Sequence, residues 1–357
     1  MSERMRVAVV GLGVGLQHVA AWRELDELFE LVAVCDVDEG RARAVAQKLD
    51  IPRAVTSFEA LLQGDDAPDL IDVCTPPHLH FDMCVTALEA GKHVVCEKPL
   101  VPSLAVCDEL LRIEAEAPGV LMPIFQYRFG NGLRRLMRLK ELGLTGDAYL
   151  SSIETAWLRG ADYYAVEWRG KWKTELGGCM TTHAIHAHDI LCNVMGPVAS
   201  VFARTATRVN PIETEDCAAV SLAMADGSLA TLSVTLGARP EISRLRFVFE
   251  NVTAESSLEP YHPSSDPWTF TAASPELQKQ IDEATADVTP RRQLYAGQFE
   301  AFHESLEAGA PAPVTLADAR ASLELLTAIY DSSQTGRAVD LPIDADHPRF
   351  SGWLPGG

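Results

Sequence analysis

Short, continuously apolar runs separated by helical patterns characterise the first part of the chain. The helical patterns extend up to residue 28 and over residues 39–49, 58–62 and 80–90, the last of which precedes Gly91. Strands that are apolar at every position are typical of a parallel sheet covered by helices on both faces. The pattern therefore predicts an α/β fold built on a doubly wound parallel sheet. Its predicted strands are residues 6–10, 31–35, 70–74 and 93–96, with a shorter one near residues 54–55.

After residue 123 the pattern changes to alternating strands mixed with longer helices. The pair Asp226-Gly227 between two such strands is a strong hairpin signal. Residues 261–287 are rich in proline, serine and acidic residues, and we expect them to form an exposed excursion. The predicted strands are residues 151–157, 201–207, 218–224, 228–236 and 244–249, and the predicted helices are residues 133–141, 182–195, 298–308 and 316–332.

This change of pattern predicts two domains. Residues 1–124 would form the doubly wound domain, and residues 125–357 would form an α+β domain with a large, mostly antiparallel, open-faced sheet.

The composition of the chain indicates which partners and compartments to expect. The 50 acidic and 30 basic side chains give a formal net charge of −20, which disfavours binding to nucleic acid or to anionic membranes. No apolar run approaches the length of a membrane span, and residues 1–6 lead into the first strand without the apolar stretch of a signal peptide. The eight cysteines form no CxxC pair. We therefore expect a cytoplasmic protein.

A glycine cluster follows the first predicted strand and opens a helix. In the dinucleotide fingerprint GxGxxG, glycines allow the tight turn, the approach of the pyrophosphate and close helix–strand packing. Here Gly11 and Gly13 match, but the third position is Leu16 and a glycine comes one residue early at Gly15, after Val14. The cluster predicts a Rossmann cofactor loop, and a plain strand-to-helix turn is the alternative.

Asp36 ends the second predicted strand, 25 residues after Gly11. A carboxylate there can accept hydrogen bonds from both adenosine ribose hydroxyls and would repel a 2′-phosphate. We therefore expect NAD rather than NADP. Arg41 and Arg43 are evidence in the other direction unless they lie on a solvated helix face, and Asp36 could instead cap a helix.

Two further strand ends carry polar residues. Thr75 and Pro76 follow the strand 70–74, and Glu97 and Lys98 follow the strand 93–96. Ligands of open α/β sheets bind outside the carboxyl ends of the strands, so these residues should lie near the glycine loop. Lys98 is the basic side chain of this set, and an ion pair with Glu97 is the alternative role.

Histidines concentrate in one segment of the second domain. If residues 182–195 form a helix, His183 and His186 share a face, as do His186 and Asp189. The spacing matches no zinc motif such as HExxH, so we expect no metal site. A histidine with a carboxylate one turn away suits general-base chemistry, and a hydrogen-bonded core histidine is the alternative.

An aromatic-rich segment precedes the histidines. Trp157, Tyr163 and Trp168 could stack on the faces of a sugar, while Arg159 and Arg169 could hold polar or anionic groups. Aromatic residues of a core or a subunit interface are the alternative.

Taken together, these segments resemble the Gfo/Idh/MocA family of NAD(P)-dependent oxidoreductases, typified by glucose–fructose oxidoreductase and inositol 2-dehydrogenase. The resemblance runs nearly end to end. It rests on residues 72–80, on residues 90–99 ending in Glu97-Lys98-Pro99, on Gln126-Tyr127-Arg128-Phe129, and on residues 318–320, 329–332 and 335–337.

The resemblance implies roles for particular side chains. Lys98 would contact both the substrate and the nicotinamide, and His186, three residues before Asp189, would be the acid/base. The family commonly has an aspartate four residues before that histidine, where this chain has Thr182, so His183 could carry the proton instead. The expected cofactor residues are Gly11, Gly13, Val14, Gly15, Asp36, Thr75, Pro76, His80, Glu97, Lys98 and Gln126, and the expected substrate residues are Lys98, Arg128, Trp157, Tyr163, Trp168, Thr182 and His186.

The sequence thus predicts an NAD-dependent dehydrogenase or reductase that acts on a sugar, a polyol or a sugar derivative. Glycoside cleavage by transient oxidation and elimination is one alternative, and a nucleotide-binding regulator without turnover is another. The resemblance also implies that the second domain binds the substrate and that the protein forms a homodimer or homotetramer through the open sheet of this domain.

Overall fold

The computed structural model describes residues 4–64 and 66–354, which form two compact units. The first unit comprises the chain up to Ile124 together with Tyr295–Arg320. The second unit comprises Phe125–Leu294 and the chain from Ala321 onward. Residues 1–3, part of the N-terminal segment in which we expect no signal peptide, lie outside the described residues.

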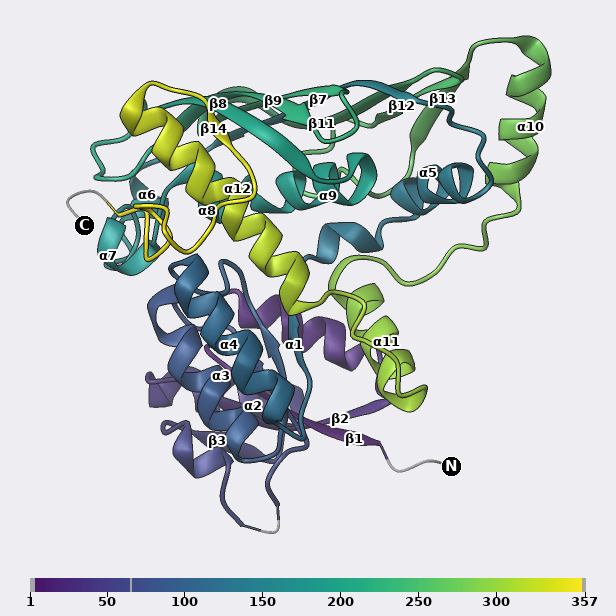
Figure 1. The fold of residues 1–357 in the computed structure, drawn as a ribbon. Coiled ribbons are helices and arrows are strands. Elements are labelled where there is room, and N and C mark those ends of the chain that lie inside the picture. The colour runs from purple at the N-terminus through teal and green to yellow at the C-terminus, as the bar shows by residue number, and fades with distance from the viewer. Residues whose placement is uncertain (1–3, 65, 355–357) are drawn as a thin grey trace. The chain divides into compact units, whose positions relative to one another are not determined.

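The first unit is built on a six-stranded parallel sheet in the order β3-β2-β1-β4-β5-β6. This order reverses between β1 and β4, which is the topological switch point of a Rossmann fold. The predicted doubly wound sheet is confirmed, and its helices are labelled in Figure 1. The strands are β1 (Met5–Val10), β2 (Phe29–Cys35), β3 (Arg53–Val55), β4 (Leu70–Val73), β5 (His93–Cys96) and β6 (Leu121–Pro123), and the helices are α1 (Gly15–Arg23), α2 (Glu39–Leu49), α3 (His80–Glu89) and α4 (Leu104–Glu116), with short 3₁₀ turns at Glu59–Leu61 and Pro77–Leu79.

A helix from far along the chain completes this unit. In α11 (Leu294–Glu307), the ring of Phe299 stacks on Trp22 of α1 with their centroids 3.7 Å apart. The amide of Gln298 donates to the backbone oxygen of Pro123 at 2.8 Å. The first unit is therefore discontinuous in sequence.

The second unit is built on an eight-stranded sheet in the order β13-β12-β11-β7-β10-β9-β8-β14. Neighbouring strands are antiparallel except β7 and β10, which are parallel. This confirms a mixed, mostly antiparallel sheet. The strands are β7 (Ala148–Leu158), β8 (Val198–Ala206), β9 (Cys217–Met224), β10 (Leu229–Thr235), β11 (Gly237–Phe249), β12 (Val252–Ser256), β13 (Trp268–Ala272) and β14 (Val339–Asp340).

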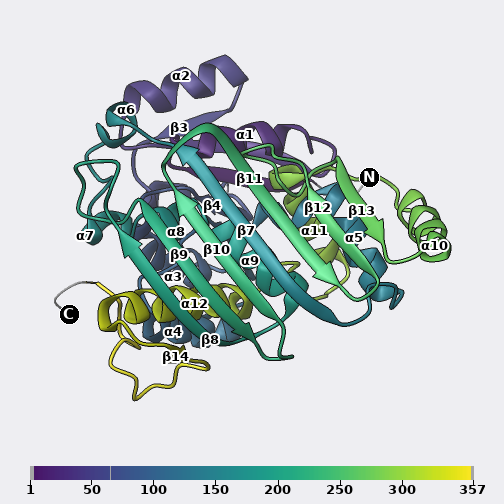
Figure 2. The same cartoon turned by 90° about the horizontal axis from the view of Figure 1, so that it is seen from above.

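Helices lie against one face of this sheet, and Figure 2 looks onto the other face. Buried and exposed residues alternate along β9 and β10, as expected for a sheet with one covered face. The helices of this unit are α5 (Asn131–Glu141), α6 (Ala161–Tyr164), α7 (Trp172–Glu175), α8 (Cys179–Thr182), α9 (Ile185–Met195), α10 (Pro275–Ala286) and most of α12 (Leu316–Thr335), with a 3₁₀ turn at Gln126–Phe129.

The prediction of an exposed excursion over residues 261–287 is right for exposure, because most of these residues are exposed, but wrong in expecting an excursion from the fold. This segment contains β13 and α10, and the side chains of Trp268 and Ile281 are buried. Ser274 caps α10 by accepting from the backbone N–H of Leu277, and Pro275 is the first residue of the helix. Ser274 and Pro275 are helix-start residues, and Glu276, Asp282 and Glu283 lie along α10. The residues that precede β13 are Pro263, Ser264, Ser265, Asp266 and Pro267.

Several predicted helix boundaries also differ from the structure. Residues 58–62 form only the 3₁₀ turn at Glu59–Leu61, and α11 begins at Leu294 rather than at residue 298. The first helix ends at Arg23 rather than at residue 28. The helix expected over residues 182–195 is interrupted after α8, because His183 has φ −114° and ψ −54° and α9 begins only at Ile185. His183 and His186 therefore do not share the face of one helix.

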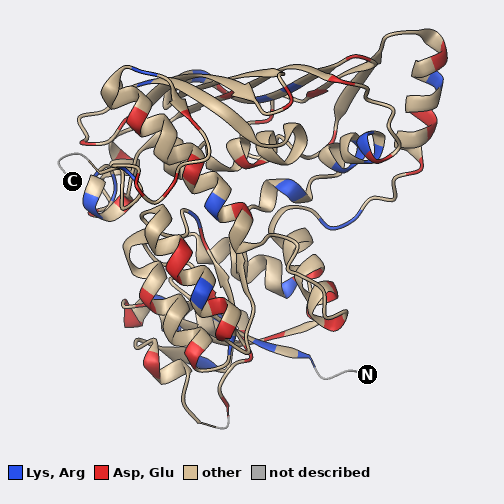
Figure 3. Cartoon of the chain, viewed as in Figure 1, with Lys and Arg blue, Asp and Glu red and all other residues tan. Residues whose placement is uncertain are grey.

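Among the described residues, we find no helix that combines the length and the apolarity needed to cross a bilayer. Acidic segments occur on the helices of both units, whereas basic residues gather on α5 (Figure 3). Several of these basic residues have local partners: Arg135 pairs with Asp266, and Lys140 donates to the backbone oxygen of Val194.

Candidate functional site

The glycine loop lies between β1 and α1 at the switch point of the first unit. Gly11 has φ +91°, and a Cβ there would lie 2.6 Å from the backbone oxygen of Cys74. A Cβ on Gly13 would meet no atom within 4 Å, so this position faces open space. A Cβ on Gly15 would lie 3.1 Å from the side chains of both Val9 and Cys74. Gly15 thus provides the close helix–strand packing that the fingerprint assigns to its third glycine.

The first residue after β2 is Asp36, whose buried carboxylate faces the glycine loop. One oxygen accepts from the backbone N–H of Leu12 at 2.9 Å, and the other accepts from the N–H of Asp38 at 2.9 Å. The N-cap of α2 is Asp38, which accepts from the N–H of Arg41. Asp36 is therefore not the cap of this helix. The Arg41 guanidinium lies 3.3 Å from Asp36 and is half exposed.

His80 joins two of the strand-end loops. The ring is buried, with Nε2 2.8 Å from the backbone oxygen of Thr75 and Nδ1 3.0 Å from that of Pro99. Burial lowers the pKa of His80, and the two carbonyl contacts counteract this only in part. The residue thus ties the Thr75 loop to the turn that carries Lys98.

The turn after β5 holds Glu97 and Lys98. The Lys98 side chain is partly exposed, whereas the Glu97 carboxylate is buried. One oxygen of Glu97 accepts from the backbone N–H of Lys98 at 2.9 Å, and the other accepts from the Tyr295 hydroxyl at 3.0 Å. The second oxygen also lies 3.1 Å from Nε2 of His18.

In the second unit, His186 lies on the first turn of α9. Its ring is buried, with its centroid 4.8 Å from that of Tyr127 and 6.3 Å from that of Phe125. Arg128 donates to both oxygens of Asp189, at 2.7 and 2.6 Å. This bidentate pair joins the 3₁₀ turn at Gln126–Phe129 to α9.

His183 lies in the break between α8 and α9. The Thr182 hydroxyl donates to the backbone oxygen of Gly178 at 2.8 Å and lies 2.7 Å from Nδ1 of His183. The single proton of the Thr182 hydroxyl is used by Gly178, so a neutral His183 ring would donate to Thr182 through Nδ1 and carry its lone pair on Nε2. The His183 ring lies 5.6 Å from Trp157 and 5.4 Å from Tyr163 between centroids.

The predicted aromatic cluster is confined to the second unit and carries two paired arginines. Arg159 lies 5.1 Å above the Trp157 ring and pairs with Glu241 at 3.1 Å. Arg169 lies 4.4 Å above the Trp168 ring and pairs with Glu175 at 3.5 Å. Each guanidinium thus has both an aromatic face and a carboxylate beside it.

A buried carboxylate that the sequence analysis missed holds the segment carrying Thr182. Glu215 accepts from the backbone N–H of Gly178 and Met180 at 3.0 Å and from the Tyr330 hydroxyl at 2.9 Å. Burial raises the pKa of Glu215 to about 7, against the lowering effect of these hydrogen bonds. No local signal points to Glu215, because its partners come from α8 and α12.

Two family models match the chain. "Oxidoreductase family, NAD-binding Rossmann fold" matches residues 5–125, and "GFO/IDH/MocA C-terminal domain" matches residues 133–255. The chain belongs to the Gfo/Idh/MocA oxidoreductase family. The resemblance inferred from the strand-end motifs is thereby confirmed.

Two curated relatives and one solved structure match this Gfo/Idh/MocA chain over nearly their whole length. D-glucoside 3-dehydrogenase of Escherichia coli strain K12 is 27% identical over 95% of this chain and 98% of that protein. D-xylose 1-dehydrogenase (NADP(+)) 2 of Haloferax volcanii is 28% identical over 92% and 97%. The WlbA dehydrogenase of Bordetella pertussis, solved with NADH and UDP-GlcNAcA, superimposes with a TM-score of 0.83 at 27% identity, covering 96% of this chain and 100% of that one.

The first unit of this Gfo/Idh/MocA oxidoreductase fits an NAD(P) cofactor. Gly13 faces open space at the N-terminal end of α1, where backbone N–H groups and the helix dipole favour a pyrophosphate. The Asp36 carboxylate lies at the same loop, at the position that holds the ribose in Rossmann folds.

Proposed function

We propose that this chain is an NAD-dependent dehydrogenase that transfers a hydride between a carbinol carbon of a sugar, a polyol or a sugar derivative and the nicotinamide. The observation that carries this proposal is the strand-end arrangement of the first unit. The Asp36 carboxylate is hydrogen-bonded to the glycine loop, and Lys98 follows β5, two strands from that loop in the same sheet. The substrate class is supported by the names of the relatives, which are dehydrogenases of a glucoside and of xylose.

The preference for NAD rests on the charge at the ribose position. A 2′-phosphate would lie against the buried carboxylate of Asp36 and near Asp38. Arg41 already pairs with both carboxylates, at 3.3 and 3.8 Å, which reduces its capacity to compensate a phosphate. The NADH bound by the WlbA dehydrogenase supports the same choice.

Lys98 is proposed to stabilise the developing alkoxide and to hold the substrate hydroxyl. Its ammonium group provides the electrostatic stabilisation that a neutral side chain cannot replace. When bound, NAD supplies the hydride acceptor. Lys98→Met should leave NADH affinity within about twofold and lower turnover by about 10²-fold, by analogy with the loss of an oxyanion donor.

His186 is the proposed acid/base, and His183 is its rival. In the oxidative direction the base must be neutral beforehand, so turnover should rise with pH through an inflection in the neutral range. His186 is proposed because the HxxD spacing of the family matches it. His183 is the second candidate for the base, because a lone pair on its Nε2 would accept the substrate proton.

Binding of Gln126 to a ligand is supported by one further observation. Its side chain is buried, and within the described part of the chain no group donates a hydrogen bond to Oε1. Such an acceptor is costly unless a ligand or water donates to it.

We also propose a homodimer or homotetramer that packs through the uncovered face of the eight-stranded sheet. Tyr149 and Leu229 are each 54% exposed on this sheet, and Phe202 is 41% exposed. Light scattering after size-exclusion chromatography tests the assembly, and a monomer at micromolar concentration would contradict it. The eight free cysteines further support a reducing compartment such as the cytoplasm.

The experiment for this proposal is a panel of aldoses, polyols, sugar acids and aryl glycosides with NAD, read by NADH absorbance and by release of the aglycone. Accumulation of NADH in the wild-type chain but not in Lys98→Met supports the dehydrogenase. Release of the aglycone without net formation of NADH would show that the protein cleaves glycosides and is not a dehydrogenase. Cofactor binding with neither product would indicate a regulator.

The two histidines are separated with single variants. His186→Asn should remove the pH inflection, whereas His183→Asn should preserve it. The opposite result assigns the base to His183.

A further inference from the structure

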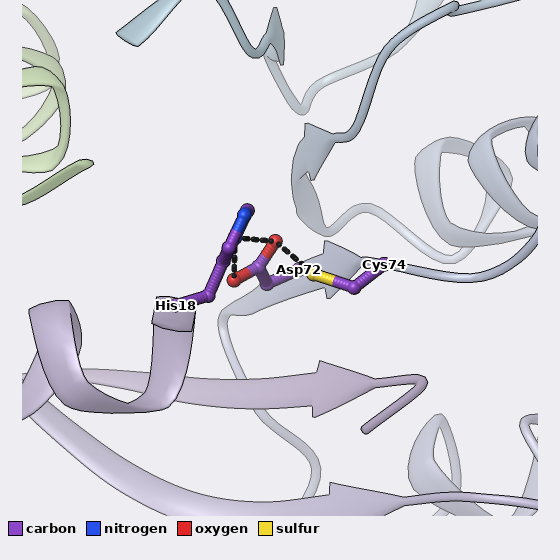
Figure 4. A group of neighbouring side chains, drawn as sticks. All are labelled: His18, Asp72 and Cys74. Atoms are coloured by element: carbon purple, nitrogen blue, oxygen red, sulfur yellow. Dashed lines mark hydrogen bonds and ion pairs between the residues drawn. The ribbon is translucent and has the colours of Figure 1, made fainter. Parts of the chain in front are cut away.

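A cluster of ionisable side chains is buried inside the first unit. His18 lies on α1, Asp72 on β4 and Glu97 after β5, and all three side chains are withdrawn from solvent. Nδ1 of His18 is 2.9 Å from one oxygen of Asp72, and Nε2 is 3.1 Å from an oxygen of Glu97. Figure 4 shows the His18 ring directed at the Asp72 carboxylate, with Cys74 beside it.

The geometry determines the protonation of His18. A neutral imidazole donates through one nitrogen, whereas here both nitrogens face carboxylate oxygens, which accept. Burial by itself lowers the pKa of His18, but the Asp72 carboxylate and the neighbouring Cys74 together outweigh this effect and hold the pKa well above its ordinary value. His18 is therefore an imidazolium between two carboxylates.

Neutral groups from the surrounding elements complete the cluster. Trp22 of α1 donates to Asp72 at 2.7 Å, and Tyr295 of α11 donates to Glu97 at 3.0 Å. The thiol of Cys74 lies 3.4 Å from Asp72, and the Phe299 ring lies 5.5 Å from the His18 ring between centroids. One positive and two negative side chains thus meet in a site closed by α1, β4 and α11.

The same neighbourhood has the spacing of a metal site, because one ligand atom each of His18, Asp72 and Cys74 lie within 4.8 Å of one another. Two features favour a proton over a metal ion. Both nitrogens of His18 already face carboxylates, and burial raises the pKa of the Cys74 thiol well above its ordinary value.

We propose that His18 is a positioning residue that fixes the turn carrying Lys98, an inference that rests on the role proposed above for Lys98. Asp72 orients the imidazolium, the imidazolium holds one oxygen of Glu97, and the other oxygen of Glu97 accepts from the Lys98 backbone N–H. His18 lies one turn into α1, which begins at Gly15 of the glycine loop. The same helix therefore starts at the glycine loop and contacts, through His18, the turn that carries Lys98. One short helix thereby couples the cofactor loop to the lysine.

Hydrogen exchange of single amides in the whole chain tests this positioning without a substrate. His18→Gln should speed exchange of the Lys98 amide by about tenfold or more, because Glu97 loses its charged donor, while the amides of Val9 and Val10 in β1 change by less than about twofold. The matched control is Tyr295→Phe, which removes a neutral donor from the same Glu97 oxygen and should have a smaller effect. Unchanged exchange at Lys98, or equal acceleration at Lys98 and β1, would overturn the proposal.

A charge-balanced variant covers the case in which His18→Gln fails to fold. His18→Gln combined with Asp72→Asn removes one positive and one negative charge together, so the fold is expected to persist. The Lys98 amide should still exchange faster by about tenfold, because Glu97 still lacks the ring donor. Wild-type protection of Lys98 in this double variant would show that His18 only balances charge.

The catalytic consequence is tested by a double-mutant cycle, with any sugar that the wild-type chain oxidises. If His18 acts through Lys98, then His18→Gln should lower kcat by about tenfold in the wild type and by less than about twofold in Lys98→Met. Equal losses in both backgrounds would contradict the coupling. If no sugar is oxidised, the function proposed above fails, and the exchange measurement still decides whether His18 positions the turn.

Discussion

Replacing Glu215 by glutamine should remove a specific part of the pH dependence of stability. The carboxyl is buried and accepts hydrogen bonds from Gly178, Met180 and Tyr330. Glutamine keeps the size of the side chain and one acceptor oxygen, but it cannot ionise. The comparison therefore isolates the titration of this one group.

The magnitude follows from the pKa. Burial raises the pKa of Glu215 to about 7 from an ordinary value of 4.5. Because the folded state holds this proton more tightly than the unfolded state, the resulting stabilisation is complete below pH 4.5 and is lost as the pH rises through about 7. At ~1.36 kcal/mol per pH unit, the loss over this window is about 3 kcal/mol.

Urea unfolding at pH 4.5, 6 and 7.5 measures this effect. The wild type minus Glu215→Gln difference in unfolding free energy should decrease by about 3 kcal/mol between the lowest and highest pH, because other titrations cancel in the difference. A difference that stays constant across the three pH values would refute the reasoning. A decrease of this size would show that the segment carrying Thr182 is held by a carboxyl that releases its proton near neutrality.

Three further changes have defined outcomes. Asp36→Ser should narrow the difference in binding free energy between NADH and NADPH by ~1.5–3 kcal/mol, as for one charge-assisted hydrogen bond, and equal binding of the two cofactors by the wild type would refute the assignment. Gly15→Val should crowd Val9 and Cys74, and it should lower both NADH affinity and the free energy of unfolding in urea, the latter by ~1–3 kcal/mol. Gly13→Ala, at a position that faces open space, should keep wild-type stability. His188 has a pKa lowered to about 3 by burial, and within the described residues neither of its ring nitrogens has a hydrogen-bond partner. The contribution of neutral His188 to the free energy of unfolding should be complete above pH 6.5 and be lost, by on the order of 4 kcal/mol, as the pH falls toward 3. Unfolding of His188→Leu should therefore be less sensitive to acid. An unchanged acid transition in this variant would show that protonation of His188 does not drive the loss of stability.

Local patterns in the sequence were sufficient to predict the fold class and to locate the glycine loop between β1 and α1. Strands that are apolar at nearly every position predicted the parallel sheet, and Asp226-Gly227 predicted the hairpin between β9 and β10. The structure also explains the glycine that comes one residue early in the loop, because Gly15 provides the close helix–strand packing expected of the third glycine of the fingerprint. These features depend on neighbours in sequence or on one strand–helix turn.

Features that depend on distant partners could not be predicted in this way. Glu215 is defined by Gly178 and Tyr330, and Glu97 is defined by His18 and Tyr295, which are far apart along the chain. The helix break at His183 likewise has no proline or glycine to mark it.

The most direct test of the central claim is the transfer of deuterium from a sugar to the cofactor. The wild-type chain is incubated with NAD and a sugar that is fully deuterated on carbon, chosen from those that yield NADH, and the reduced cofactor is examined by mass spectrometry. We expect the deuterium to appear at C4 of the nicotinamide and Lys98→Met, with cofactor affinity retained, to form this product ~10²-fold more slowly. Reduced cofactor without deuterium, or an unchanged rate in Lys98→Met, would show that the protein does not transfer a hydride in the proposed way.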